Sequence, residues 1–461
     1  MKALRDPDRL LTEGLAAIRG QFKVPQGFAP ELEAAAQTAA QRSPDGHKDR
    51  TAEPFVTLDP ASSTDLDQAF TIEAAGGDLL LHYAIADVAW FVRDGDPLDG
   101  EAWTRGETLY LPDGKAGLYP KALGEGAASL LPDGPRPAVV FTTRVAPDGT
   151  VKLAGAERAI IRSRGKLAYE TATEAELPAG FAELSRRITD AEVARGAARV
   201  DPPEQEVERD ALGHFKLVLR PLVLAEQRNA ALSLATNLAV AEALFAAKTG
   251  LFRVMAGPDA RAIARLRYTA RALGLSWANG DSLETFEKTL DPAQPNAAAF
   301  MLAIRRAGNG ASYVPYQEGE KPWHAAMAAT YCHMTAPLRR LADRYVIRAA
   351  LAVVNGKPVP AEVTAAFATL GPVMGKADAR ANQIDRAVID LAEAATLSGR
   401  EGESFAAVVT DVDEVGPRIQ LCDVPVVTRV TAHSVTPGEK LTVRLVAADP
   451  VKRTVSFARI A

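Results

Sequence analysis

The stretch TLDPASSTDLDQAF, residues 57–70, carries three aspartates on a turn that leads into a strand-like run. Asp65 and Asp67 are two positions apart, so both carboxylates face the same side if this segment is extended. The turn at Pro60 could fold Asp59 back towards them. Mg²⁺ prefers carboxylate oxygens and usually completes its shell with water and substrate phosphate. The stretch therefore indicates a metal site for phosphate chemistry; the alternative is a set of ordinary turn residues, because Asp and Ser are common in loops.

Strand patterns surround this stretch, and helical patterns dominate later in the chain. Short apolar runs divided by Gly and Pro predict strands at residues 55–58, 68–74, 78–86, 138–145 and 150–162. Runs rich in Ala and Leu predict helices that include residues 230–248, 259–273 and 375–397. The fold class expected here is α+β, with a mixed-sheet half followed by a helical half.

The two ends of the chain differ from this middle part. An alanine-rich run opened by Pro30 predicts a helix at residues 30–42. After Gly399, valine-rich runs at residues 404–412, 418–421, 425–431, 440–447 and 454–458 predict a small OB-type β-barrel, a fold that binds oligonucleotides. The predicted organisation is a short helical segment at residues 1–50, a large domain at 51–398 and a barrel at 399–461.

Composition narrows the kinds of function. The net charge of −5 argues against nucleic acid covering the whole surface, but Lys and Arg concentrate at residues 158–166 and 339–348, as an internal basic groove requires. Cys332 and Cys422 have neither disulfide nor zinc-site spacing, and the six histidines form no H-x-x-x-H pair. A bound metal is therefore expected to have oxygen ligands.

The hydropathy of the chain and the composition of its first residues predict the cellular compartment of the protein. No run of about twenty apolar residues occurs, since the richest stretch, residues 238–247, contains Glu242. Residues 1–15 are charged throughout and lack the apolar centre of a signal peptide. We expect a cytoplasmic protein with no membrane span.

A second motif, TAPLRRLADRYVIR at residues 335–348, supports phosphate chemistry. Pro337 is expected near the start of a helix, followed by two arginines and by Asp343, four residues beyond Arg339. The rigid guanidinium fork suits a phosphate that gains charge as it reacts. The alternative is a solvated helix face with a salt bridge.

These motifs together resemble the ribonuclease II, or RNB, family of processive 3′-to-5′ exoribonucleases. The family signature D-x-x-x-x-x-D-x-D-D is matched by Asp59, Asp65 and Asp67. AIADVAWFV and PLDGEAWTRGETLYLPDG are similar to its next segments, and HAAMAATYCHMTAPLRRLADRYVIR resembles its histidine- and arginine-containing run. The similarity extends in order from about Phe55 to Leu397.

The resemblance implies an RNB catalytic domain at residues 51–398 and hydrolysis of single-stranded RNA to nucleoside 5′-monophosphates, by a protein expected to be a monomer. Asp59, Asp65 and Asp67 would bind or orient Mg²⁺, with Mn²⁺ as an alternative, and Arg339 would steady the scissile phosphate. The remaining residues assigned to RNA contact are Tyr110, Tyr169, Arg340 and Asp385. For the tyrosines the alternative is a place in the buried core.

The sequence also departs from the family pattern. Gln68 stands where the family has a fourth aspartate; it can still offer a carbonyl oxygen to a metal but removes a negative charge, so metal affinity should fall. Other replacements are Ala84 for His, Ala336 for Ser, Leu341 for Tyr and Ile347 for His. A short helical segment stands in place of the two cold-shock barrels with which family members usually begin.

Two other functions follow from these observations. Loss of the fourth aspartate suggests an RNA-binding protein of the same fold that has lost catalysis. Without the resemblance, a metal-dependent hydrolase of small phosphorylated molecules would explain the aspartates, although such an enzyme has no need of an oligonucleotide-binding barrel.

Overall fold

The strand that follows the aspartates forms the edge of the main sheet. The computed structural model describes residues 7–197, 204–209, 214–220, 223–291, 294–308, 310–413, 415–432 and 434–460. Within these residues the main sheet has the order β1-β6-β5-β4-β3. Its strands are β1 (Lys48–Asp49), β3 (Gln68–Ala75), β4 (Asp78–Ala86), β5 (Arg136–Val145) and β6 (Val151–Ile161). β3 to β6 pair antiparallel, and β1 joins β6 in parallel. The strands expected at 68–74, 78–86, 138–145 and 150–162 are confirmed.

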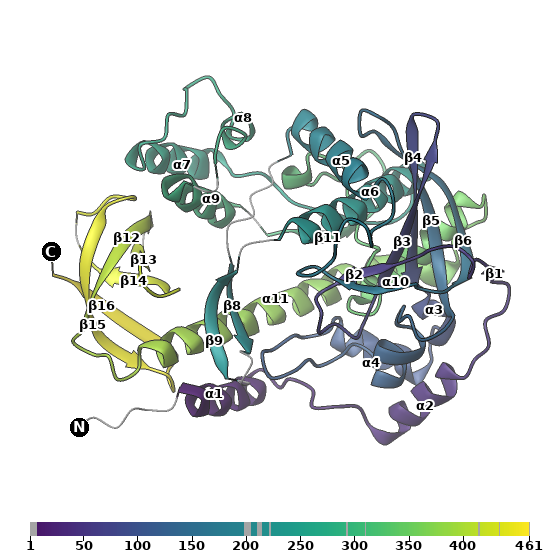
Figure 1. Cartoon of the computed structure of the whole chain (residues 1–461), viewed down its shortest axis with the longest axis horizontal. Coiled ribbons are helices and arrows are strands. Elements are labelled where there is room, and N and C mark those ends of the chain that lie inside the picture. The colour runs from purple at the N-terminus through teal and green to yellow at the C-terminus, as the bar shows by residue number, and fades with distance from the viewer. Residues whose placement is uncertain are drawn as a thin grey trace.

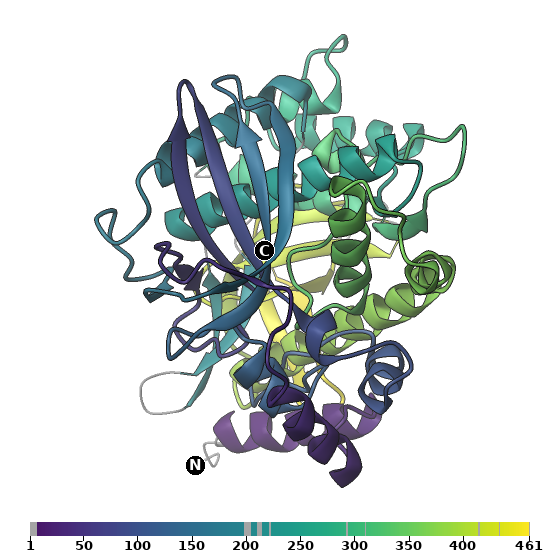
Figure 2. The same ribbon diagram turned by 90° about the vertical axis from the view of Figure 1, so that its right-hand side faces the viewer.

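Helices lie along one side of this sheet, as Figures 1 and 2 show. They are α5 (Phe181–Arg195), α6 (Leu224–Ala246) and α10 (Leu341–Val354). Among the described helices, α6 alone is long and apolar enough to cross a membrane by length and composition, but 61% of its most apolar window is buried inside the protein. Packing against the sheet and its neighbours accounts for that apolar character.

The helical half also contains a small unit with its own core. It consists of α7 (Ala260–Ala272), α8 (Leu283–Glu287) and α9 (Pro295–Ala307), with Leu266, Phe286 and Phe300 at its centre. Asp259 caps α7 by accepting from the Ala262 amide (2.7 Å), which confirms the helix expected at 259–273. The hairpin of β10 (Leu251–Val254) and β11 (Ser312–Pro315) flanks this unit in the sequence.

The long helix α11 (Ala361–Leu397) starts fourteen residues earlier than the sequence predicts. The sequence predicts helix at residues 375–397, whereas the structure extends it over Pro372, which cannot donate to the helix ladder. In the structure the helix continues through Pro372, since Phe367, Leu370 and Met374 on either side are buried in the main core. Burial of these side chains therefore outweighs the local cost of proline.

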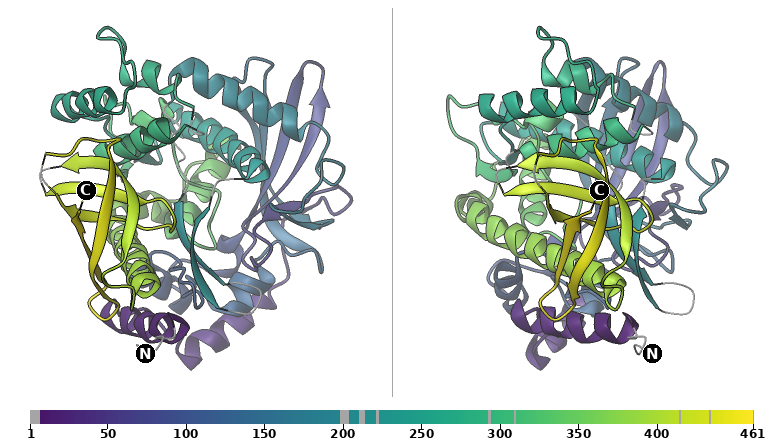
Figure 3. Two further views of the ribbon diagram at one scale, coloured as in Figure 1. Left: turned by 60° about the vertical axis from the view of Figure 1, so that its left-hand side comes forward. Right: turned by 90° about the vertical axis from the view of Figure 1, so that its left-hand side faces the viewer.

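The predicted C-terminal barrel is confirmed. Its strands are β12 (Ser404–Asp413), β13 (Gly416–Leu421), β14 (Val427–Thr431), β15 (Lys440–Asp449) and β16 (Thr454–Arg459), closed in the order β12-β13-β14-β16-β15. All neighbouring pairs are antiparallel except β14 with β16. Figure 3 shows this barrel at the end of α11. The result is the five-stranded OB-type architecture.

The N-terminal segment is helical, as predicted, and packs into two different cores. Residues 1–6 of the predicted segment lie outside the described residues. α1 (Pro7–Gln21) packs on α11, and a Cβ at Gly14 would lie 2.4 Å from Leu391 Cδ1, so only glycine permits this close approach. α2 (Pro30–Ala40) instead contributes Ala36 and Ala39 to the main core. The segment thus links the region around the barrel to the sheet.

A buried carboxyl joins α11 to the barrel and to the hairpin of β8 (Glu204–Arg209) and β9 (Phe215–Arg220). Glu393 on α11 is 4% exposed, and its Oε1 accepts from Gln205 Nε2 (2.7 Å) and from the Val427 amide (2.8 Å). Burial raises the pKa of Glu393 to about 7, although these two hydrogen bonds lower it. The folded protein therefore holds this carboxyl protonated at pH values where the unfolded chain has lost the proton.

We predict that Glu393→Gln removes a pH-dependent part of the stability. Because the folded pKa is above the unfolded one, the wild type loses stability as pH rises from about 4.5 to about 7, by roughly 3 kcal/mol at most. Glutamine keeps an oxygen that accepts both hydrogen bonds and has no proton to lose. In urea unfolding, the variant should be the more stable protein at pH 8, and its advantage should disappear below about pH 4, where both states hold the proton. Glu403→Gln, at a half-exposed position, is the control. An advantage that does not change with pH would contradict the assignment.

Candidate active site

The loop between β2 (Thr57–Asp59) and β3 is held in place by a distant segment. The Ser129 hydroxyl donates to the Thr64 carbonyl (2.8 Å) and accepts from the Leu66 amide (2.9 Å). The Leu130 amide donates to the Leu66 carbonyl (2.9 Å). Contacts with a segment some sixty residues away, rather than a regular strand, therefore set the directions of the aspartate side chains.

Asp65 lies between two donors. The Tyr110 hydroxyl donates to its Oδ2 (2.7 Å), and the Lys115 ammonium donates to its Oδ1 (2.7 Å). Burial raises the pKa of Tyr110, and the charge of Asp65 raises it further, so the phenol stays protonated. Asp65 thus fixes the orientation of the Tyr110 side chain, which is 48% exposed.

Asp67 connects the sheet half of the chain to the arginine motif. Its Oδ1 accepts from the Leu338 amide (2.7 Å), and its Oδ2 lies 3.5 Å from Nε of Arg339. Burial raises the pKa of Asp67 to about 8, while Arg339 and the Leu338 amide lower it. Arg339 and the Leu338 amide offset only part of the cost of burying the negative charge of Asp67. A further cation near this carboxylate would therefore stabilise its charged form.

Asp59, at the end of β2, lies beside Tyr169. The Tyr169 amide donates to the Asp59 carbonyl (3.2 Å), and the Tyr169 hydroxyl accepts from Asn229 Nδ2 (3.1 Å). Burial raises the pKa of Asp59 to about 7, Arg339 lowers it and Asp65 raises it. Since Arg339 also lowers the pKa of Asp67, one guanidinium influences the carboxyl groups of both Asp59 and Asp67.

The aspartates do not form a closed metal cage by themselves. Within the described part of the chain, no group of three or more His, Cys, Asp or Glu side chains could hold a metal ion. Asp65 is bound to Lys115 and Tyr110, whereas the half-buried Asp59 and the buried Asp67 have raised pKa values. This oxygen donor set fits Mg²⁺, which commonly takes only one or two carboxylates and fills its shell with water and phosphate oxygen.

Gln68 is the first residue of β3, and its side chain faces a buried tyrosine. The Tyr83 hydroxyl on β4 donates to Gln68 Oε1. The oxygen that the sequence suggests as a metal ligand therefore already accepts a hydrogen bond.

The arginine pair lies before a helix rather than within it. α10 begins at Leu341, and Arg340 has an extended backbone. The sequence places the start of this helix near Pro337, ahead of the arginines; this is wrong, because the helix begins only after them, so Arg339 and Asp343 do not share one helix face. Asp343 Oδ2 instead accepts from Arg340 Nη2 (2.7 Å) and from the Ala336 amide (2.8 Å). Arg339, with 47% of its side chain exposed, is left beside Asp67.

Residues 106–108 run antiparallel to the arginine pair and bring Tyr110 close to it. The Thr108 amide donates to the Arg339 carbonyl (2.9 Å), and the Leu341 amide donates to the Gly106 carbonyl (2.9 Å). Gly106 has φ +74°, and a Cβ there would lie 2.7 Å from the Cβ of Ala377 on α11. Glycine is thus required both by the backbone angle and by the approach of α11.

Four residues assigned from the sequence line one cavity of about 230 Å³ beside Asp67. These are Tyr110, Arg339, Arg340 and Asp385, the last from α11. Tyr169 does not line this cavity but lies next to Asp59. The structure therefore gathers these residues from segments that are far apart in the chain.

The sequence did not identify three charged residues of this region. Lys115 binds Asp65, Lys166 lowers the pKa of Asp59, and Glu107 lines the cavity. Burial raises the pKa of Glu107 to about 7, and Asp378 raises it further. The two lysines lie in YLPDGK and GKLAYE, close in the sequence to Tyr110 and Tyr169. This proximity to the assigned tyrosines is the feature of the sequence that could have pointed to them.

Comparison with known families identifies two domains. The RNB domain model matches residues 47–356. The model of the RNase II-type exonuclease C-terminal S1 domain matches residues 403–460. The second match coincides with the closed barrel.

Curated relatives carry ribonuclease names. Ribonuclease R of Aquifex aeolicus is 26% identical over 428 residues, covering 86% of this chain and 59% of the relative. Ribonuclease R of Escherichia coli is 26% identical over 448 residues, covering 87% and 53%. Exoribonuclease 2 of Enterobacter sp. is 28% identical over 417 residues, covering 82% and 61%. The chain thus spans less than two thirds of the length of these relatives.

Solved structures share the fold. RNase R of Mycoplasma genitalium in complex with ribose methylated single-stranded RNA superposes with a TM-score of 0.86 at 19% identity, covering 98% of this chain and 78% of that chain. Yeast Ssd1, described as a pseudonuclease, superposes with a TM-score of 0.70 at 18% identity, covering 92% and 56%. Because the RNB domain match covers well over half of its length and an RNase II-type S1 domain follows, the chain belongs to the RNB family.

Proposed function

We propose that this protein hydrolyses single-stranded RNA processively from the 3′ end and releases nucleoside 5′-monophosphates. The observation that carries the proposal is the cavity in which Tyr110, Arg339, Arg340 and Asp385 meet beside the buried Asp67. The ribonuclease names of the relatives and the RNA complex formed by the Mycoplasma genitalium protein support RNA as the substrate.

The two tyrosines would contact bases. The hydroxyl of Tyr110 is engaged by Asp65, so its half-exposed ring is held in one orientation. Stacking on such a ring accepts every base, because each base has a π-face. Tyr169, held by Asn229, would act in the same way next to Asp59.

Arg339 would bind the phosphate that reacts. Its guanidinium is half-exposed and lies against Asp67, so donors remain directed away from that carboxylate. Fixed positive charge near a phosphate that gains negative charge lowers the barrier to its hydrolysis.

Asp59 and Asp67, with Asp65 beside them, would hold Mg²⁺, or Mn²⁺ in its place. When bound, such an ion polarises a phosphoryl oxygen and makes water a better nucleophile. The aspartates would contribute carboxyl oxygens as ligands, losing their protons as the ion binds, and the Leu338 amide keeps Asp67 in position.

The first test is an assay with 5′-labelled single-stranded RNA, in Mg²⁺ and in chelator, with products resolved by length over time. We expect full-length RNA to disappear into one short labelled product with few intermediates, and only with the metal. Labelled mononucleotide as the first product would mean attack from the 5′ end, and intact RNA in Mg²⁺ would contradict the proposed activity.

Asp67→Asn should abolish turnover while leaving RNA binding nearly intact. Asparagine keeps an oxygen for the Leu338 amide but loses the charge, which should lower the rate at least about a hundredfold because metal-assisted stabilisation contributes several kcal/mol. Rates and gel-shift affinities would be measured together, with Asp148→Asn on an exposed turn as the control. A wild-type rate in Asp67→Asn would refute the site assignment.

The second candidate function is RNA binding without catalysis. It is favoured by Gln68, whose amide oxygen is occupied by the Tyr83 hydroxyl, and by the similarity of the fold to a pseudonuclease. Under this alternative the RNA would shift on a gel and stay intact in Mg²⁺. The presence of all three aspartates and of Arg339 makes the catalytic function our choice.

Gln68→Asp should lower the Mg²⁺ concentration needed for half-maximal rate, because it adds a carboxylate to the site. Tyr83→Phe is the matched control: it removes the same hydrogen bond but adds no charge, so it should leave the Mg²⁺ requirement nearly unchanged. An equal Mg²⁺ requirement in wild type and Gln68→Asp would show that position 68 takes no part in metal binding.

A further inference from the structure

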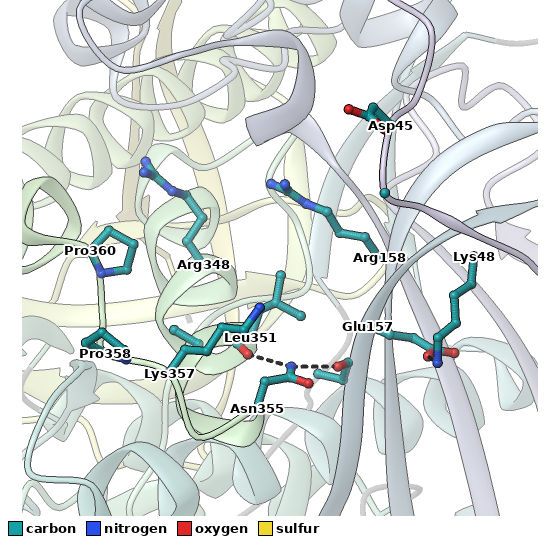
Figure 4. Close-up of a pocket in the computed structure, with 13 residues that line it drawn as sticks. Asp45, Lys48, Glu157, Arg158, Arg348, Leu351, Asn355, Lys357, Pro358 and Pro360 are labelled. Atoms are coloured by element: carbon teal, nitrogen blue, oxygen red, sulfur yellow. Dashed lines mark hydrogen bonds and ion pairs between the residues drawn. The ribbon is translucent and has the colours of Figure 1, made fainter.

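A second cavity, of about 710 Å³, shares no lining residue with the cavity at Tyr110. Figure 4 shows its walls. They are formed by β6, by the second half of α10, by the chain before β1 and by the connection from α10 to α11. We call it the α10 pocket.

The two main walls of the α10 pocket are tied together by one side chain. Asn355 Nδ2 donates to the Ala156 carbonyl on β6 (2.9 Å) and to the Leu351 carbonyl on α10 (2.7 Å). Both bonds are drawn in Figure 4. The floor of the pocket is therefore fixed before any ligand arrives.

Arg158 presents an anchored guanidinium to this pocket. Its Nε lies 2.9 Å from Oδ2 of Asp87, a carboxylate that is 1% exposed and also lies 3.1 Å from His47 Nε2. No other partner binds the Arg158 side chain within the described part of the chain, so its two terminal nitrogens are available, and 34% of the side chain is exposed. Asp87 positions this guanidinium by an ion pair, without a hydrogen bond to Nε, and the planar fork of the two terminal nitrogens matches the geometry of a phosphate.

Lys357 adds a second available cation. It is exposed, and its ammonium has no partner among the residues described. The other cations are already compensated: Arg348 binds Asp94 (2.6 and 2.8 Å), and Lys48 binds Glu157. Positive charge that a ligand can use therefore comes from Arg158 and Lys357.

The part of the pocket formed by the end of α10 and by the connection to α11 also carries apolar side chains. Leu351 and Ala352 lie on α10, and Pro358 and Pro360 lie on the connection to α11. A flat ring or a sugar could pack against these side chains while a phosphate reached the cations. The volume falls in the usual range for small-molecule sites of about 300–1,000 Å³.

We propose that the α10 pocket is a second binding site for a nucleotide 5′-phosphate, with the phosphate on Arg158 and Lys357 and the base against the apolar wall. The ligand is either a free nucleotide or the 5′-phosphorylated end of an RNA strand. This inference does not rest on the proposed exonuclease activity, since a protein inactive on RNA would bind the nucleotide equally well.

The test is photolabelling of the full chain with 8-azidoadenosine 5′-monophosphate in chelator, followed by mapping of the labelled peptides. We expect label on residues 351–360, separate from any label near Tyr110 or Tyr169. Lys357→Glu should reduce that label about tenfold, as loss of a charge-assisted contact implies. Lys248→Glu, an exposed lysine outside the pocket, should leave it unchanged. Arg158→Lys, which keeps the charge opposite Asp87 but loses the fork, should also reduce it.

Competition experiments distinguish the contribution of the phosphate from that of the nucleoside. They also distinguish a free nucleotide from the 5′ end of an RNA strand. Adenosine 5′-monophosphate should protect residues 351–360, and adenosine should not. If a 5′-phosphorylated tetranucleotide protects these residues, an RNA end is a ligand of the pocket. If it does not protect them, the ligand is the free nucleotide. No label on residues 351–360, or full label in Lys357→Glu, would refute the site. Equal protection by inorganic phosphate would refute the role of the apolar wall.

Discussion

The hydrogen bond from the Leu338 amide to Asp67 is the contact on which the site depends, because it joins the two halves of the chain. Asp67 closes the loop before the first long strand, and Leu338 directly precedes the arginine pair, 271 residues later. The bond is buried, so breaking it would leave Oδ1 of Asp67 without its donor inside the protein. It also sets where Arg339 lies, and the raised pKa of Asp67 follows from the same burial.

Helix α11 places the remaining parts of the molecule around this contact. Its first half is buried in the main core, its middle supplies Asp385 to the cavity, and its second half carries α1, the β8–β9 hairpin and the barrel. The barrel and the cavity at Tyr110 thus lie along one helix. The packing of Leu391 on Gly14 connects the N-terminal helix to the same element.

The distribution of charge is consistent with the proposed binding of RNA by an acidic chain. The net charge is −5, yet cationic nitrogens that make no hydrogen bond to a carboxylate occur at Arg339, beside the aspartates, and at Arg158 and Lys357, in the α10 pocket. Local potential rather than net charge decides where a phosphate is drawn. Both places rely on a buried carboxylate, Asp67 or Asp87, which holds an arginine in one orientation.

The sequence by itself determined the element types, the closing barrel and the set of aspartates and tyrosines, because periodicity, turn residues and ordered motifs are local signals. It did not determine the start of α11, where burial of Phe367 and Met374 outweighs Pro372, or the pairing of Asp343 with Arg340, which depends on where the helix begins. Contacts such as Asp65 with Lys115 join distant segments, and no local pattern records them. The start of this helix and these side-chain pairs were decided only by the tertiary structure. The physical reason is that burial and long-range hydrogen bonds exist only once the chain is packed.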